Sequence, residues 1–138
     1  MSVRFRVERR VDDVEGVWRR LSKLEDMPKY WSGHRQVEVL GRSGGVVSLR
    51  VKFAFPGPLN EGYAEASIDE IKREVLINYV RGPFTGVVKN YVRDGLLASE
   101  WDISLSPLFV LFKPWISSHF KKGAQHALDR LAQAQTEA

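Results

Sequence analysis

The chain has 138 residues, no cysteine and a formal net charge of +4 at neutral pH. This length predicts one domain, over residues 1–134, followed by a disordered tail at 135–138. The absence of cysteine excludes disulfides, thiolate catalysis and cysteine-ligated metals, and it favours a cytoplasmic location. The longest apolar run, at 108–112, is too short to cross a bilayer, and the first residues lack the apolar core of a secretory signal.

Residues 1–33 predict one strand and two short helices. Apolar side chains at positions 3, 5 and 7 alternate with charged ones at 4, 6 and 8, which is the period of a half-buried strand. Asp12 and Glu15 form an Asp-x-x-Glu box, a signature of a helix N-terminus, and we expect that helix to end at Pro28. A second helical turn is expected from Met27 to Gly33.

From His34 onward the apolar period changes to two, which predicts a series of antiparallel strands. Their expected ranges are 34–42, 46–55, 61–71, 74–81, 87–93 and 96–105. The dipeptide at 94–95, Asp-Gly, is typical of a two-residue type I′ turn, and this turn sets Asn90 opposite Ser99. We expect the face with Asn90 and Ser99 to meet the core. The opposite face, which we expect in water, carries Lys89, Tyr91, Arg93, Ala98, Glu100 and Asp102.

The last third of the chain predicts a long helix that needs a broad apolar surface. Ser106 followed by Pro107 is a helix start, and apolar residues then recur at three- and four-residue steps as far as Leu131. Pro114 lacks an N–H and clashes with the preceding turn, so we expect a short piece at 107–112 and a longer helix from Pro114. Whether 107–113 acts as a lid, an interface or part of the core stays open.

The order of these elements, with Val17-Trp18-x-x-Leu21 and Met27-Pro28-x-Tyr30-Trp31, resembles the START-like (SRPBCC) superfamily, which includes the polyketide cyclase/dehydrase proteins. The segments 81–86 and 106–108 look most like the branch of coenzyme Q-binding START proteins. The resemblance implies an α+β helix-grip fold, in which a curved seven-stranded antiparallel sheet surrounds the C-terminal helix. It also implies an elongated cavity for lipids, sterols, quinones or polyketides, and no catalytic set common to all members.

Strand alternation and helix periodicity indicate which side chains would line such a cavity. In strand 74–81 both faces are apolar; we place Leu76 and Asn78 inward because Arg81 should face water, and the opposite parity stays open. Two readings remain for the whole set, since these side chains either surround a ligand or fill the core completely. The expected ligand-binding residues are Trp18, Trp31, Phe53, Phe55, Leu76, Asn78, Asn90, Ser99, Trp101, Phe112, Ile116, His119 and Phe120.

The buried polar residues among them have two interpretations as well. Asn90 and Ser99 either bond to each other across the hairpin or contact the polar group of a ligand. His119 and His126 are two helical turns apart, too far to bind one zinc ion, so no metal or other cofactor is expected. His119 is the candidate for an acid or base, although no nucleophile–base motif accompanies it.

These observations favour a protein that binds a hydrophobic small molecule: a lipid, an isoprenoid quinone or a polyketide-like compound. Catalysis is left open, and a cyclase or dehydratase acting in the same cavity is the first alternative. The second is a module that associates with RNA or a ribosome, because arginines and lysines concentrate between positions 4 and 23. Peripheral membrane contact through 108–112 and the oligomeric state also stay open.

Overall fold

A computed structural model describes residues 2–54, 60–107 and 113–133 of the chain. The helices and strands follow one another in the order that the sequence predicts, with one short 3₁₀ turn, η1, added between the first two helices. In chain order they are β1 (Ser2–Arg10), α1 (Val14–Leu21), η1 (Leu24–Asp26), α2 (Met27–Tyr30), β2 (His34–Ser43), β3 (Val46–Phe53), β4 (Glu61–Asp69), β5 (Glu74–Arg81), β6 (Phe84–Arg93), β7 (Leu96–Leu105) and α3 (Lys113–Gln133).

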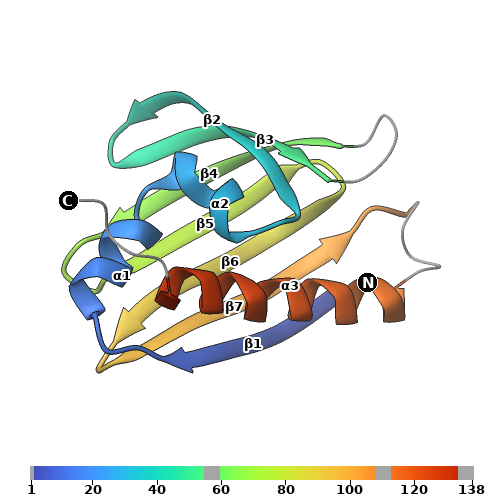
Figure 1. Cartoon of the computed structure of the whole chain (residues 1–138). Helices are drawn as coiled ribbons and strands as arrows, with labels where there is room; N and C mark the ends of the chain where they lie inside the picture. The colour runs from blue at the N-terminus through green and yellow to red at the C-terminus, as the bar shows by residue number, and fades with distance from the viewer. Residues whose placement is uncertain (1, 55–59, 108–112, 134–138) are drawn as a thin grey trace.

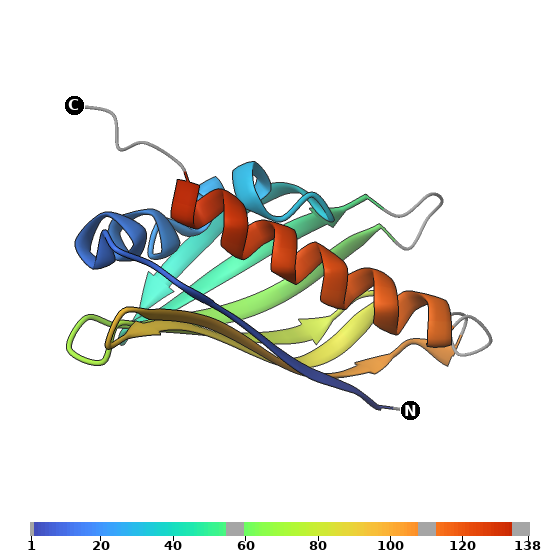
Figure 2. The ribbon, with the colours of Figure 1, turned by 60° about the horizontal axis from the view of Figure 1, so that its bottom comes forward.

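The seven strands form one antiparallel sheet in the order β1-β7-β6-β5-β4-β3-β2, so β1 and β2 are its two edges. The sheet curves, and α3 lies across its concave face, with α1 and α2 beside one end of α3 (Figures 1 and 2). This arrangement confirms the predicted α+β helix-grip fold.

Helix α3 packs most closely on the half of the sheet formed by β1 and β7. Its buried face carries small residues at Ala124 and Ala127, and short side chains let a helix approach its neighbour closely. At its far end, the guanidinium group of Arg20 in α1 donates two hydrogen bonds to the carbonyl of Leu131, 2.7 and 3.0 Å long. None of the helices in the described part of the chain is long and apolar enough to cross a membrane.

The expected start and end of the first helix are wrong. Asp13, not Asp12, caps α1, because its carboxylate accepts a hydrogen bond from the backbone N–H of Gly16 (3.0 Å). The helix already ends at Leu21. Pro28 instead lies in the first turn of α2, where its missing N–H breaks no helical hydrogen bond.

The hairpin register predicted from Asp94-Gly95 is confirmed, with Asn90 opposite Ser99. The expectation that its outer face is fully exposed to water is wrong for Tyr91 and Ala98, which are both buried. Arg93 lies over the Tyr91 ring, 4.5 Å from its centroid, and Arg6 donates a 3.1 Å hydrogen bond to the Tyr91 hydroxyl. The aliphatic parts of the Arg6 and Arg93 side chains therefore cover this part of the sheet.

The inward face chosen for β5 is also wrong. Arg81 faces water as expected, but Val75, Ile77 and Tyr79 are buried while Leu76 and Asn78 are exposed. The reason is a β-bulge: Tyr63 pairs with Arg81 and the next residue, Ala64, pairs with Tyr79, so Val80 is an extra residue. An extra residue reverses the alternation of side chains between the two faces of the sheet. The exposure of Arg81 therefore predicts the wrong face for Leu76 and Asn78.

Candidate functional site

A pocket of about 570 Å³ lies between α3, the turn from α2 to β2, the end of β3, the start of β6 and the middle of β7. Most of its lining is apolar or aromatic, which is typical of a site for a small organic molecule. The lining residues are Trp31, Ser32, Gly33, His34, Phe53, Ala54, Phe84, Trp101, Trp115, Ile116, His119, Phe120, Lys122, Gly123, Ala124 and His126.

Four aromatic rings form one wall of this pocket, and Phe84 is at their centre. Its ring centroid lies 5.2 Å from that of Phe53, 5.5 Å from that of Phe120 and 6.1 Å from that of Trp101. The planes are inclined by 47–67°, the tilted and edge-on arrangements that aromatic quadrupoles favour. The rings come from β3, β6, β7 and α3, so only the folded chain brings this wall together.

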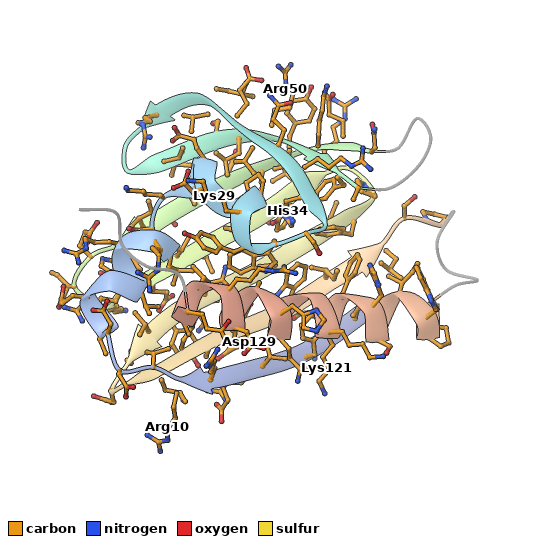
Figure 3. All side chains as sticks on the ribbon, in the orientation of Figure 1. Arg10, Lys29, His34, Arg50, Lys121 and Asp129 are labelled. Carbon is orange, nitrogen blue, oxygen red and sulfur yellow. The ribbon has the colours of Figure 1, made fainter. Side chains whose placement is uncertain are left out.

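His34 places a titratable group in the pocket lining. Its Nε2 atom is hydrogen-bonded to the hydroxyl of Tyr79 at 2.8 Å, and its ring packs edge-on against Phe53 at 5.1 Å. Burial lowers the pKa of His34 from 6.5 to about 4 and raises the pKa of Tyr79 above its usual value. Both groups are therefore neutral at physiological pH. In Figure 3 His34 lies inside the molecule, between β2 and α3, whereas Arg10 and Arg50 project from its surface.

Two β-bulges bring this pair together. On β2, His34 pairs with Phe53 and Gln36 with Lys52, so Arg35 is an extra residue, as Val80 is on β5. At each bulge the alternation of side chains between the two faces of the sheet is reversed. His34 and Tyr79 therefore point to the inner face. From the sequence we expected Leu76 and Asn78, and not Tyr79, to face inward. Neither bulge has a glycine or another local signal at its extra position.

The turn that carries Trp31 is fixed by its backbone. The N–H of Trp31 donates to the carbonyl of Met27 (2.8 Å), and the carbonyl of Trp31 accepts from the N–H of His34 (3.0 Å). The side chain is 4% exposed, and its indole nitrogen has no hydrogen-bond partner among the residues that the structure describes.

The rim of the pocket on the α3 side is exposed and polar. Trp115 is 65% exposed and stacks on the imidazole of His119, with ring centroids 4.9 Å apart and planes inclined by 8°. Lys122 and His126 are exposed on the same helix and also line the pocket. His119, the candidate acid or base, therefore belongs to the rim.

The structure brings six of the predicted site residues into the pocket lining and places five others elsewhere. Trp18 is buried away from it, with its indole N–H donating to Glu70 at 2.7 Å. Leu76 and Asn78 lie on the outer face of the sheet, and Phe55 and Phe112 fall outside the described residues. The six lining residues are Trp31, Phe53, Trp101, Ile116, His119 and Phe120.

Asn90 and Ser99 are buried beside the pocket without lining it. The Ser99 hydroxyl donates to the side-chain oxygen of Asn90 and accepts from the indole N–H of Trp101 at 2.9 Å. Of the two interpretations of this pair, the bond across the hairpin is therefore the one that the structure confirms.

Four of the basic residues near the N-terminus, Arg4, Arg6, Arg9 and Arg20, have acidic or backbone partners. Arg4 pairs with Asp102 and Arg9 with Asp129, each at 3.1 Å, while Arg6 pairs with Glu8 and Glu100. This pattern does not support the alternative of a module that contacts RNA or a ribosome. Within residues 2–54, 60–107 and 113–133, no group of three or more metal-binding side chains is found.

Solved structures resemble the fold along nearly its whole length. The Zhui aromatase/cyclase from Streptomyces sp. R1128 has a TM-score of 0.66 at 12% identity, covering 96% of this chain and 91% of its own. A START superfamily protein from Mycobacterium smegmatis has a TM-score of 0.67 at 16% identity, with coverages of 96% and 97%. A STAR-related lipid transfer protein from Xanthomonas axonopodis has 0.63 at 12%, with coverages of 94% and 86%.

No protein-family model and no curated protein sequence matches the chain. The nearer resemblance to coenzyme Q-binding proteins is not tested by these comparisons and stays a prediction. At identities of 12–16% the likeness concerns the fold alone. In that sense the resemblance inferred from the sequence is confirmed, and the chain has the START-like, or SRPBCC, helix-grip fold.

Proposed function

We propose that this protein binds a hydrophobic small molecule in the pocket between α3 and the sheet. The observation that carries the proposal is the pocket itself, about 570 Å³ in volume and walled by Phe53, Phe84, Trp101 and Phe120. This volume lies within the range of small-molecule sites, about 300–1,000 Å³. The transfer of apolar ligand surface out of water supplies the affinity, about 25 cal/mol per Å² before the costs of association.

The chemistry of the lining favours an apolar ligand with few polar groups. Apart from Ser32, which is exposed in the turn between α2 and β2, the charged or exposed polar residues of the described lining are at the rim, on α3, while the interior polar groups at His34 and Trp31 are neutral. Names of similar structures point the same way, since they include a lipid transfer protein and an aromatase/cyclase. A lipid, an isoprenoid quinone or a polyketide-like compound would each suit such a site.

Gly123 offers a way to block the pocket without disturbing the core. It lines the pocket, and a Cβ atom built on it meets no heavy atom within 4 Å. Gly123→Leu should therefore project an isobutyl group into the ligand space while the helix gains a residue with higher helical propensity. Gln125→Leu is the matched control, because Gln125 is exposed on the same helix and does not line the pocket.

The test is native mass spectrometry of the purified protein, combined with organic extraction of what it carries. We expect a co-purifying apolar compound with the wild type and with Gln125→Leu, and its loss with Gly123→Leu. The proposal is wrong if all three proteins carry nothing and no lipid, quinone or aromatic polyketide raises the melting temperature of the wild type.

A second candidate function is catalysis in the same pocket, and the His34–Tyr79 pair is the observation that favours it. A neutral imidazole oriented by a hydroxyl can accept a proton from a bound substrate and then return it. The test is ring closure of a linear aromatic polyketone, compared between the wild type, His34→Gln and Tyr79→Phe. Turnover that is lost in both variants while binding persists would support an enzyme, and equal rates with and without protein would exclude it for this substrate class.

A further inference from the structure

His34 uses one of its two ring nitrogens within the described part of the chain. Nε2 is hydrogen-bonded to the hydroxyl of Tyr79 at 2.8 Å, and no described residue is bonded to Nδ1. A neutral imidazole carries a donor on one nitrogen and an acceptor on the other, so Nδ1 keeps a hydrogen-bonding capacity that the fold does not use. The residue is only 5% exposed, and buried polar groups nearly always have a partner, so this free nitrogen needs an explanation.

The free nitrogen is accessible from the pocket. Among the described residues, the one side-chain nitrogen or oxygen that is both sealed from water and unpaired is Nε1 of Trp31. Nδ1 of His34 is unpaired but not sealed, so a molecule of the size of water reaches it. Because His34 lines the pocket and exposes almost no other surface, this access is through the pocket. An oxygen atom of a bound molecule can therefore reach Nδ1 as well.

The hydroxyl of Tyr79 determines which ring nitrogen carries the proton. Tyr79 is 2% exposed, and His34 is the one hydrogen-bond partner of its hydroxyl among the described residues. If Nε2 donated to the hydroxyl oxygen, the hydroxyl hydrogen would be buried without an acceptor, which is costly. The stable arrangement is therefore the one in which the hydroxyl donates to Nε2 and the imidazole proton is on Nδ1. In this tautomer His34 presents an N–H donor to the pocket.

The charges around the pocket indicate the type of acceptor that suits this donor. Lys122, the one lysine or arginine of the described lining, is exposed at the rim, so a carboxylate in the interior would lose its hydration without gaining a cation. Burial lowers the pKa of His34 from 6.5 to about 4, so the imidazole supplies no positive charge at neutral pH either. An uncharged carbonyl or ether oxygen loses less hydration on burial and can still accept the hydrogen bond.

We propose that the Nδ1–H group of His34 donates a hydrogen bond to an uncharged oxygen of the bound molecule, so that the pocket prefers apolar ligands with a carbonyl or ether oxygen. Tyr79 is a positioning residue, because it holds the ring and fixes the tautomer. The inference rests on the proposed binding function and adds the chemical feature by which a ligand is recognised. Proton abstraction by His34, as in the second candidate function, would need the other tautomer, with the lone pair of Nδ1 in the pocket.

The test uses three rigid tricyclic probes of similar shape. Fluorene has no polar group, 9-fluorenone has only an acceptor, and carbazole has only an N–H donor. Dissociation constants are measured by equilibrium dialysis for the wild type, Gly123→Leu and His34→Gln. The amide of a glutamine can take the place of Nε2 and accept from Tyr79, but no group of it takes the place of Nδ1.

The preference for 9-fluorenone over fluorene is the quantity that tests the donor. We expect this preference to be about fivefold greater in the wild type than in His34→Gln, the effect of one hydrogen bond. Comparison between proteins cancels the difference in hydrophobicity between the probes. Carbazole should bind the wild type no better than fluorene does, because its N–H would meet another donor. A wild type that prefers carbazole to 9-fluorenone would overturn the inference, since Nδ1 would then be an acceptor.

A second readout needs no variant that removes the donor. A long-range ¹H–¹⁵N spectrum distinguishes the protonated nitrogen of an imidazole from the unprotonated one, and for His34 in the wild type we expect the proton on Nδ1. Addition of 9-fluorenone should shift the Nδ1 resonance more than addition of fluorene does. The indole N–H of Trp18, which is buried away from the pocket and donates to Glu70, is the internal reference. In Tyr79→Phe the tautomer is no longer fixed, and we expect a mixture of both forms.

The outcomes separate this inference from the proposed function. Binding of fluorene that Gly123→Leu abolishes supports the proposed function whatever happens at His34. A proton found on Nε2, or an equal preference for 9-fluorenone in the wild type and in His34→Gln, would overturn the inference alone. If no probe binds the wild type up to its solubility limit, the inference fails together with the proposal that the pocket binds apolar molecules.

Discussion

Nε2 of His34 lies 2.8 Å from the hydroxyl oxygen of Tyr79. The two residues lie on different strands, β2 and β5, and are 45 positions apart in the sequence. Both are almost completely buried, and neither has a charged neighbour that shifts its pKa. Because each is the other's polar partner, removal of one leaves a desolvated group behind. The pair thus links the edge strand β2 to the centre of the sheet and orients the imidazole that lines the pocket.

The strength of this link is measurable with a double-mutant cycle. Tyr79→Phe removes only the hydroxyl and should lower the free energy of unfolding by about 1–3 kcal/mol, because His34 then has an unpaired buried nitrogen. Urea denaturation of Tyr79→Phe, His34→Leu and the double variant gives the coupling energy. We expect a coupling of about 1 kcal/mol; additive effects would show that the hydrogen bond does not form.

The depressed pKa of His34 predicts a loss of stability in mild acid. The pKa is about 4 in the folded chain and 6.5 for the free side chain, so the unfolded chain binds a proton first as the pH falls. The contribution of His34 is complete above pH 6.5 and is lost as the pH falls towards 4. Between pH 7 and pH 5 the free energy of unfolding should decrease by about 2 kcal/mol from this residue alone.

His34→Gln is the control for that measurement. A glutamine can accept the hydrogen bond of Tyr79 but does not titrate, so its urea midpoint should change much less over the same pH interval. Parallel pH profiles for the wild type and the variant would contradict a neutral, buried His34.

The features that the sequence predicted depend on local interactions, whereas the features that it did not predict depend on contacts between distant parts of the chain. The Asp94-Gly95 turn fixes the register of β6 and β7 through local backbone geometry, since both residues have positive φ angles of 53° and 74°. The order of strands and the buried face of α3 follow from periodicity, which is also local.

The candidate site depended on features that have no local signal. The bulges at Arg35 and Val80 come from the pairing of each strand with its neighbour, and they decide whether His34 and Tyr79 face inward. The burial of Tyr91 depends on Arg6, which comes from the distant strand β1, as well as on Arg93 of its own strand. The pocket itself depends on where α3 rests on the sheet, which no single segment specifies.

The buried network of Asn90, Ser99 and Trp101 predicts a second effect on stability. Ser99→Ala leaves both the side-chain oxygen of Asn90 and the indole N–H of Trp101 without their partner. We expect a decrease in the free energy of unfolding of about 2 kcal/mol or more, from two desolvated groups. Ser48→Ala, at an exposed position on β3, is the matched control and should change stability by less than about 0.5 kcal/mol. Equal effects of the two substitutions would show that the network contributes nothing.

We expect the substitution of glycine by alanine to have opposite effects on stability at two positions of the chain. Gly86 on β6 has a φ angle of +130°, and a Cβ atom there would lie 2.3 Å from the carbonyl oxygen of Asp102 on the paired strand. Gly86→Ala must strain the backbone or part the two strands, so we expect a loss of about 3 kcal/mol. Gly123 lies within α3 with open space around it, and Gly123→Ala should stabilise the protein by about 0.5–1 kcal/mol.

Chemical denaturation of both variants, with the wild type as reference, measures this difference. The effect of Gly86→Ala should extend to the pocket, because Gly86 pairs with Tyr79 on one side and lies two residues from Phe84. If β6 and β7 part at this point, Phe84 loses its fixed contacts with Trp101 and Phe120, and the affinity for apolar probes should fall with the stability. A Gly86→Ala protein as stable as the wild type would mean that β6 does not approach β7 as closely as the structure places it.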